Sequence, residues 1–311
     1  MTLQLLLVQL LNGAQLGIIL FLVAAGLTLV FGVMNFINLA HGVQYMIGAY
    51  LTAAIGAWAG SFWIGLLLAL PTCLAIGLLL EFLVFRHLYD RNHLDQVLVS
   101  FGVILTIEEG MRALFGSAPL NVPRPEGMDG GVMIMPGLLF PTFRLAIIAA
   151  GLMVAGLLWL VVDRTRVGMR IRAGATHPAI VAVLGVDIRH LFMLVFGFGA
   201  MLAGFAGGMA GPVLAVQPGM GDSVLILAFV VIVIGGVGSI RGAFVAALLV
   251  GVVDTLGRAS IPDLLRLFMA PPDARQTGGA LASMLVYIAM SVILAFRPAG
   301  LFPVRPTGPM A

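Results

Sequence analysis

Charged residues are scarce in this chain, and lysine is absent. Only 9% of the 311 residues are charged, whereas a soluble domain has about 25%. All sixteen positions counted as Lys or Arg are arginine, and the net charge is +3. The low charge excludes an ordinary soluble domain. The positive-inside bias of membrane proteins explains the small basic excess, so we expect no nucleic-acid partner.

Cysteine and catalytic motifs are also scarce. The one cysteine, Cys73, lies in an apolar run, which excludes a disulfide framework and a cysteine-based metal site. The five histidines form no H-E-x-x-H or similar ligand pair, and no G-x-x-x-x-G-K-[ST] loop is present. We therefore expect a protein that is not an enzyme and that itself binds no metal or cofactor.

Long apolar runs take up most of the chain. Hydrophobic residues make up 61% of it, and the mean hydropathy is +1.14. Several runs exceed the ~18–20 residues that cross the hydrocarbon core of a bilayer. They are continuous, unlike the alternating segments of ~10 residues in a membrane β-barrel. The sequence therefore predicts an all-α polytopic integral membrane protein with one transmembrane domain over residues 1–311.

We expect about eight or nine membrane segments, some of them discontinuous. The number depends on residues 223–257, which form either a tight hairpin or one broken helix. The apolar segments lie at residues 3–33, 39–58, 62–85, 94–116, 143–163, 190–213, 223–239, 242–257 and 280–297.

The distribution of arginine predicts the orientation in the membrane. The loop 163–190 holds five arginines, which places it in the cytoplasm. Alternation adds five more on the same side, at positions 86, 91, 241, 297 and 305, and leaves six outside. The scheme requires residues 223–257 to cross twice. It puts the N-terminus outside, the C-terminus in the cytoplasm, and the loops 117–142 and 258–279 outside.

The two external loops differ in character. Residues 117–142 are rich in proline and glycine and cannot be helical throughout; the loop either docks an external partner or is a solvated connector. In 258–279, Leu264, Leu265 and Phe268 beside Arg266 predict a short interfacial helix.

A polar stretch interrupts the apolar sequence between residues 26 and 50. Asn35, Asn38 and His41 lie there among glycines that include Gly42 and Gly48. In lipid, polar groups and glycine breaks persist only where protein or a water-filled cavity satisfies the backbone. We expect this stretch to line a translocation path.

A second glycine-rich stretch, G-G-V-G-S-I-R-G at 235–242, resembles a nucleotide fingerprint only superficially. Arg241 stands where the third glycine is required, and membrane runs flank the stretch in place of a strand and a helix. We predict an inner turn that allows close helix approach or hinging. We expect four residues of this turn to line the translocation path: Gly235, Gly236, Gly238 and Ser239.

The arginine-rich loop contains a short helix signal. Pro178 suits a first helical turn, apolar residues follow it, and Gly185 is a plausible C-cap. Such a helix either docks into a groove of a soluble partner or lies on the anionic inner leaflet.

Acidic side chains near the outer helix ends have two interpretations. Glu108 and Glu109 precede Arg112 on one helical face, and Asp254 precedes Arg258 by one turn. An intramembrane carboxylate is a functional candidate, here at an external gate. The alternative is an ion pair neutralised by arginine.

The ordered motifs of the chain resemble a known family. They are G-L-T-L-V-F-G-V-M (26–34), I-N-L-A-H-G (37–42), M-I-G-A-Y (46–50), G-M-R-I-R-A (168–173), L-G-V (184–186), L-A-G-F-A-G (202–207), P-G-M-G (218–221), A-F-V-V-I-V-I-G-G-V-G-S (228–239) and R-P-A-G-L-F (297–302). Over nearly its whole length the sequence is similar to the permeases of branched-chain amino acid ABC transporters, in particular the LivH-like branch. Ala299 departs from the family pattern, which usually has a basic residue there.

This resemblance implies a permease subunit of an importer in the bacterial inner (cytoplasmic) membrane. Its partners would be a second homologous permease, two cytoplasmic ABC ATPases that bind ATP and Mg²⁺, and an extracytoplasmic solute-binding protein. The solute would be a branched-chain amino acid or a related small polar molecule. ATPase coupling would involve Gly168, Arg170, Arg172, His177, Leu184 and Gly185. The alternative is a self-sufficient secondary transporter or channel with glycine-broken helices.

Overall fold

The computed structural model describes residues 3–176 and 178–303, and most of them are helical. The α-helices are α1 (Leu3–Met34), α2 (His41–Ala59), α3 (Phe62–Leu83), α4 (His93–Phe115), α5 (Thr142–Arg164), α6 (Arg166–Thr176), α7 (Pro178–Val183), α8 (Ile188–Ala210), α9 (Met220–Gly235), α10 (Ile240–Leu265) and α11 (Pro271–Phe296). A short 3-10 helix, η1 (Phe85–Leu88), follows α3, and one hairpin joins β1 (Gly131–Met135) to β2 (Leu138–Pro141).

Each expected apolar segment overlaps one of these helices. Six of them, α1, α3, α5, α8, α10 and α11, are long and apolar enough to cross a membrane. The helices α2 and α4 have sufficient length but are more polar, and α9 has only 16 residues. A polytopic, predominantly helical membrane protein is therefore confirmed. The hairpin is a small exception to the all-α prediction, and it lies in the loop 117–142, which was not expected to be helical throughout.

Residues 223–257 form two helices with a short turn between them. The helix α9 ends at Gly235, α10 begins at Ile240, and Gly236 and Gly238 adopt positive φ angles of 100° and 81°. Glycine adopts this left-handed region without the steric cost that a Cβ imposes. The hairpin alternative is therefore correct, and we call residues 235–242 the glycine turn.

The expected boundaries around residues 258–279 are wrong. The helix α10 continues to Leu265 and α11 begins at Pro271, so no separate interfacial helix lies between them. Pro262 sits inside α10, and Gly278 of α11 packs closely against it. Charged residues such as Arg258 and Asp263 are typical of loops between membrane segments, and they led to the wrong boundary. A helix near a membrane surface also accommodates them, on its exposed side.

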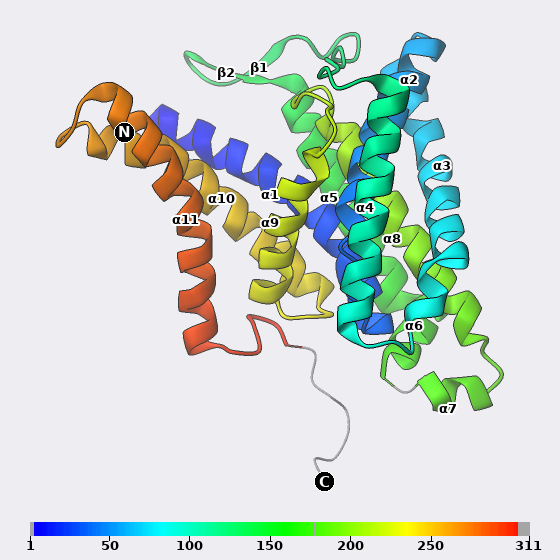
Figure 1. Ribbon diagram of the computed structural model, residues 1–311. Helices are drawn as coiled ribbons and strands as arrows, with labels where there is room; N and C mark the ends of the chain where they lie inside the picture. The colour runs from blue at the N-terminus through cyan, green and yellow to red at the C-terminus, as the bar shows by residue number, and fades with distance from the viewer. Residues whose placement is uncertain (1–2, 177, 304–311) are drawn as a thin grey trace.

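The helix α1 lies at the centre of the bundle. In its most apolar stretch 83% of the residues are buried, and it packs against α10, α8, α5 and α9 (Figure 1). Gly13 and Gly17 bring its backbone against α10 at Gly251 and Ala247. Close approach of small residues is the usual way for membrane helices to associate, because lipid removes most of the hydrophobic driving force.

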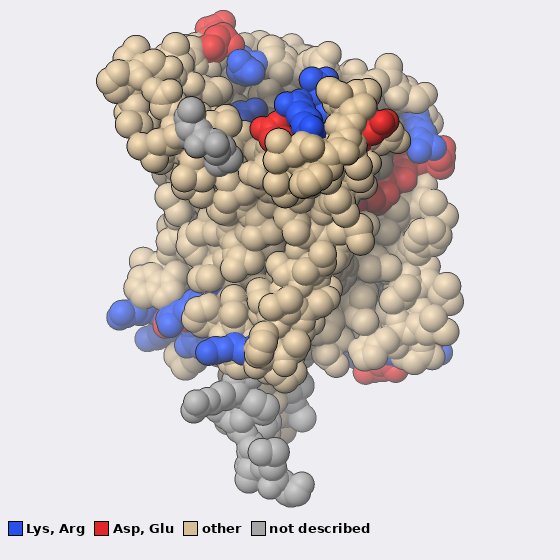
Figure 2. All heavy atoms as spheres, turned by 90° about the vertical axis from the view of Figure 1, so that its left-hand side faces the viewer, with Lys and Arg blue, Asp and Glu red and all other residues tan. Residues whose placement is uncertain are grey.

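Charged side chains gather at the two ends of the bundle. In Figure 1 the start of α1, the β hairpin and the α10–α11 link lie at the upper end, while α6, α7, the glycine turn and the end of α11 lie at the lower end. Figure 2 shows charged residues at both ends and a broad uncharged band between them on the face in view. An uncharged band between two polar ends is what a bilayer requires.

Candidate translocation cleft and coupling segment

A cleft of about 1070 Å³ opens at the lower end of the bundle, between α1, α5, α6 and the start of α10. Its walls are mainly apolar, with Phe21 and Leu29 from α1 and Phe244 from α10. A few polar side chains join them: Thr28, Asn35, Asp163, Arg172, Thr176, Ser239 and Arg241. An apolar cavity with a small number of polar groups is typical of a site for a small organic molecule.

The two predicted path stretches meet at this cleft. Gly32 of α1 packs on the Cα atom of Gly238, and Asn35, Gly238 and Ser239 all line the cavity. Asn35 ends α1 in a left-handed conformation, with φ of 48°, which asparagine tolerates better than most residues. Three of the nine predicted path residues are thus brought together at one cavity.

The glycine turn is held tightly from both sides. The Oγ atom of Ser239 accepts the N–H of Gly242 at 3.0 Å and so caps α10. Leu301 and Phe302 donate their N–H groups to the carbonyl oxygens of Ile234 and Gly235 at 2.8 and 3.0 Å. These carbonyls end α9 and have no intrahelical partner, so the C-terminal R-P-A-G-L-F motif acts as their cap.

Gly235 and Gly236, also predicted for the path, are packing positions within this turn. A Cβ atom at Gly235 would meet Gly242, and one at Gly236 would meet the carbonyl oxygen of Phe302 at 3.0 Å. Neither residue lines the cleft. Gly235 and Gly236 therefore support the wall of the cleft by packing behind the residues that line it.

Asn38, His41, Gly42 and Gly48 lie away from the cleft. The Nε2 atom of His41 donates to the carbonyl oxygen of Val23 at 3.1 Å. Val23 lies on the side of α1 that faces away from the cleft, roughly half a helical turn around the axis from Thr28. Gly42 packs on Gly221 of α9, and Gly48 packs on Gly204 of α8. The structure therefore buries this group between helices, and its role in a path stays a prediction.

The polar residues buried at and just before the start of α2 nevertheless have unused hydrogen-bonding capacity. Both side-chain heteroatoms of Asn38 and the hydroxyl of Tyr45 find no partner among the described residues. The hydroxyl of Thr28 on α1 also has no hydrogen-bond partner among the described residues, and Thr28 lines the cleft. Buried polar atoms without partners are costly, which sets this region apart from an ordinary core.

The acidic residues predicted for an external gate separate into two kinds. Arg112 pairs with Glu109 at 2.6 Å, and Arg258 pairs with Asp254 at 2.8 Å, as the ion-pair interpretation requires. Glu108 is 9% exposed and forms no ion pair among the described residues. Its carboxylate lies beside Gly219, next to the N-terminus of α9, where the helix dipole favours negative charge.

The predicted coupling segment, residues 168–185 and called the coupling segment below, lies at the lower end of the bundle (Figure 1). Leu184 is 76% and Val183 88% exposed, and Arg170 is exposed on α6. Gly185 follows α7 with φ of 87°, as a C-cap requires. Gly168 and Arg172 instead pack on the end of α5. His177 lies outside the described residues.

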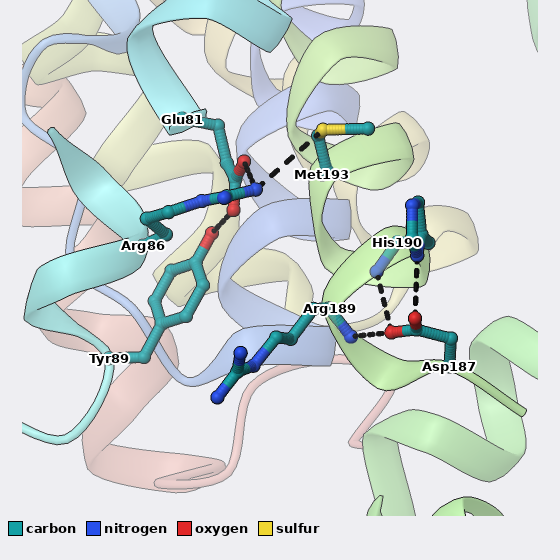
Figure 3. Close-up of polar contacts among 7 residues, drawn as sticks. All are labelled: Glu81, Arg86, Tyr89, Asp187, Arg189, His190 and Met193. Carbon is teal, nitrogen blue, oxygen red and sulfur yellow. Dashed lines mark hydrogen bonds and ion pairs between the residues drawn. The ribbon is translucent and has the colours of Figure 1, made fainter. Parts of the chain in front are cut away.

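The end of the coupling segment leads into α8, whose first turn is capped by a side chain. Asp187 caps this helix by accepting the N–H groups of Arg189 and His190, and it also contacts the His190 ring at 2.6 Å (Figure 3). These hydrogen bonds, that of the His190 side chain first, lower the pKa of Asp187.

Sequence reasoning missed a polar cluster around Glu81, which is 1% exposed at the end of α3. Tyr89 donates its hydroxyl to Glu81 at 2.8 Å, and Arg86 pairs with the same carboxylate at 3.3 Å (Figure 3). Burial and the bond to Glu81 raise the pKa of Tyr89. The Tyr89 ring packs edge-on against Phe192, so the cluster joins α3 to α8. The only sequence signal was one acid in an apolar run.

The sequence matches, over residues 9–294, the family described as branched-chain amino acid transport system / permease component. The chain belongs to this permease family. The permease is 28% identical over 305 residues to the high-affinity branched-chain amino acid transport system permease protein BraD of Pseudomonas aeruginosa, with 94% of each chain covered. No solved structure matches it significantly.

Other similar proteins are also named as branched-chain amino acid transport permeases. The permease is 28% identical over 271 residues to LivH of Salmonella typhimurium, covering 81% of this chain and 85% of LivH. It is 26% identical over 251 residues to the probable branched-chain amino acid transport permease protein LivH of Methanocaldococcus jannaschii, with 76% of each chain covered. These relatives are transport subunits, so the prediction that the chain is not an enzyme is confirmed.

Proposed function

We propose that this permease forms one half of the membrane channel of an ATP-binding-cassette importer for branched-chain amino acids. The observation that supports this best is the cleft, because it lies where the path stretches of α1 and the glycine turn meet and is bordered by α6 of the coupling segment. A second, homologous permease would complete the channel. We place the N-terminus outside and the coupling segment in the cytoplasm of a bacterial inner membrane.

The energy source lies outside the chain in this proposal. Two cytoplasmic ATPases with ATP and Mg²⁺ dock on the coupling segment, whose exposed Val183 and Leu184 supply an apolar contact. An extracytoplasmic binding protein delivers solute at the opposite end, against the loop 117–142 and the α10–α11 link. ATP binding and hydrolysis then alternate the access of the path between the two sides of the membrane.

The cleft suits the aliphatic side chain of a branched-chain amino acid. Phe21, Leu29 and Phe244 offer apolar contact, while Asn35 and Ser239 supply uncharged polar groups. The charged residues of the lining, Asp163, Arg172 and Arg241, pair with one another, which weakens the field that would otherwise hold one end of a zwitterion. The cleft is the inward part of the path in this proposal, and solute selection rests with the binding protein.

Purification and reconstitution test the proposal. The chain is isolated in mild detergent, and associated proteins are identified by mass spectrometry; we expect a second permease and two P-loop ATPases. Proteoliposomes that contain the complex and the binding protein should accumulate labelled leucine only with ATP, and those with this chain alone should not. Uptake by the chain alone, driven by an ion gradient, would instead establish the secondary transporter.

A further inference from the structure

Asp163 joins helices that are far apart in the sequence. It lies near the end of α5, and its carboxylate contacts arginines of two other helices. The Oδ2 atom is 2.5 Å from Arg241 on α10, and Oδ1 is 3.7 Å from Arg172 on α6. Asp163 is also the one acidic residue among the described residues that line the cleft.

The helix α6 is firmly attached to the end of α5. Arg172 donates to the carbonyl oxygen of Val162, and Thr165 accepts the N–H of Gly168 at 3.2 Å. Gly168 leaves no space at this corner, because a Cβ atom there would overlap the carbonyl oxygens of Val161 and Val162. A displacement of α6 must therefore also move the end of α5, where Asp163 lies.

Arg241 connects Asp163 to the wall of the cleft. It lies two residues after Ser239, in the first turn of α10, and the glycine turn packs on Gly32 of α1. The short contact between Arg241 and Asp163 is the only ion pair that the described residues form between α5 and α10. Without the carboxylate, Arg172 and Arg241 would bring two positive charges to one edge of the cleft, which repel each other.

We propose that Asp163 is a positioning residue that transmits movement of the coupling segment to the glycine turn, and thereby opens and closes the cleft. The inference rests on the proposed function, in which the ATPases move the coupling segment. Asp163 acts in this mechanism through Arg172 and Arg241, and it also borders the cleft. It determines how much of the movement caused by ATP reaches the path.

The exposure of the three side chains makes the inference testable without unfolding the protein. Asp163 is 29% exposed, Arg172 50% and Arg241 70%. Ion pairs this accessible to water add little to stability. Asp163→Asn keeps the size of the side chain and removes its charge, so the variant should fold normally. The matched control is Asp90→Asn, which removes the charge of an exposed carboxylate that does not line the cleft and lies outside the coupling segment.

The experiment measures leucine uptake and ATP hydrolysis together, in proteoliposomes of the complete complex with its binding protein. We expect Asp163→Asn and Arg241→Gln each to reduce the solute transported per ATP hydrolysed about five-fold or more, as for other coupled sites. The double variant should be no worse than either single one, since both changes break the same link. Asp90→Asn should retain the normal ratio.

Two results overturn the inference. One is an unchanged transport-to-ATP ratio in Asp163→Asn. The other is a parallel loss of uptake, hydrolysis and thermal stability, which would make Asp163 a structural residue. A wild-type complex that fails to take up solute with ATP refutes the proposed function itself, and this outcome is recognised before any variant is compared.

Discussion

At the scale of single residues, glycine determines how closely the helices of this permease approach each other. Gly48 of α2 faces Gly204 of α8 so closely that a Cβ atom would overlap the opposing backbone, and Gly207 meets Tyr45 in the same way. Gly102 of α4, in contrast, has open space around its Cα atom. The same residue type therefore has different consequences at different positions.

Gly48→Ala should destabilise the protein, because the added methyl group pushes α2 away from α8. Overpacking a close contact costs about 1–3 kcal/mol, and thermal unfolding in detergent measures this loss. Gly102→Ala is the matched control and should leave the unfolding temperature unchanged or slightly higher, since alanine favours helix. Equal unfolding temperatures for both variants would contradict the observed α2–α8 contact.

At the scale of elements, two short segments at the lower end depend on a left-handed glycine. Gly185 ends α7 with φ of 87° and no neighbour within 4 Å, and Gly300 supports the C-terminal motif with φ of 82°. An ordinary residue in this conformation costs about 1–2 kcal/mol. The two positions differ in that Gly185 is exposed whereas Gly300 is buried against Gly236.

Gly185→Arg should abolish uptake by the complex, because a bulky charged side chain would stand in the apolar surface proposed to receive the ATPase. Assembly with the second permease should persist, as no packing contact is lost. Asparagine tolerates the left-handed conformation, so Gly185→Asn should retain most of the uptake. Co-purification and leucine uptake measure the two properties, and normal uptake by Gly185→Arg would remove this residue from the coupling surface.

Gly300→Val should detach the C-terminal motif from the glycine turn. A Cβ atom at this position would lie 2.6 Å from the Cα atom of Gly236, in addition to the backbone strain of about 1–3 kcal/mol. We expect a lower unfolding temperature and reduced uptake. Ala299→Lys, at the exposed neighbouring position, should change neither. Equal behaviour of the two variants would show that the motif does not support the turn.

At the scale of the whole molecule, the distribution of charge predicts which end faces the cytoplasm. Cys73 is the only cysteine and is buried, so Cys73→Ala provides a background for single-cysteine labelling. In intact cells, Asp129→Cys should react with a membrane-impermeant maleimide. Arg91→Cys, in the exposed link between η1 and α4, should react only after the membrane is opened. The reverse pattern would invert the orientation.

The helical segments were predictable from the sequence, whereas their contacts were not. Apolar runs and glycine turns are local signals, and they located nine helices and the turn after Gly235. The end of α10 and the start of α11 were missed because Arg258, Asp263 and Asp273 resemble loop residues while they lie on exposed helix surface. The bridge from Asp163 to Arg241 spans 78 positions, and no local pattern predicts such a pair. Likewise, Asn35 lines the cleft whereas His41 is buried on the other side of α1, and only the packing around α1 reveals this difference.

The central position of α1 also has a consequence for biosynthesis. This helix ends at Met34, whereas α10, its most extensive neighbour, begins at Ile240. The ribosome must therefore produce most of the chain before the surface around Gly13 and Gly17 finds its partner. Until then this surface of α1 faces lipid or the insertion machinery. A nascent chain that stops before α10 leaves the surface without its matching helix, so the permease completes its interior only after α10 has been made.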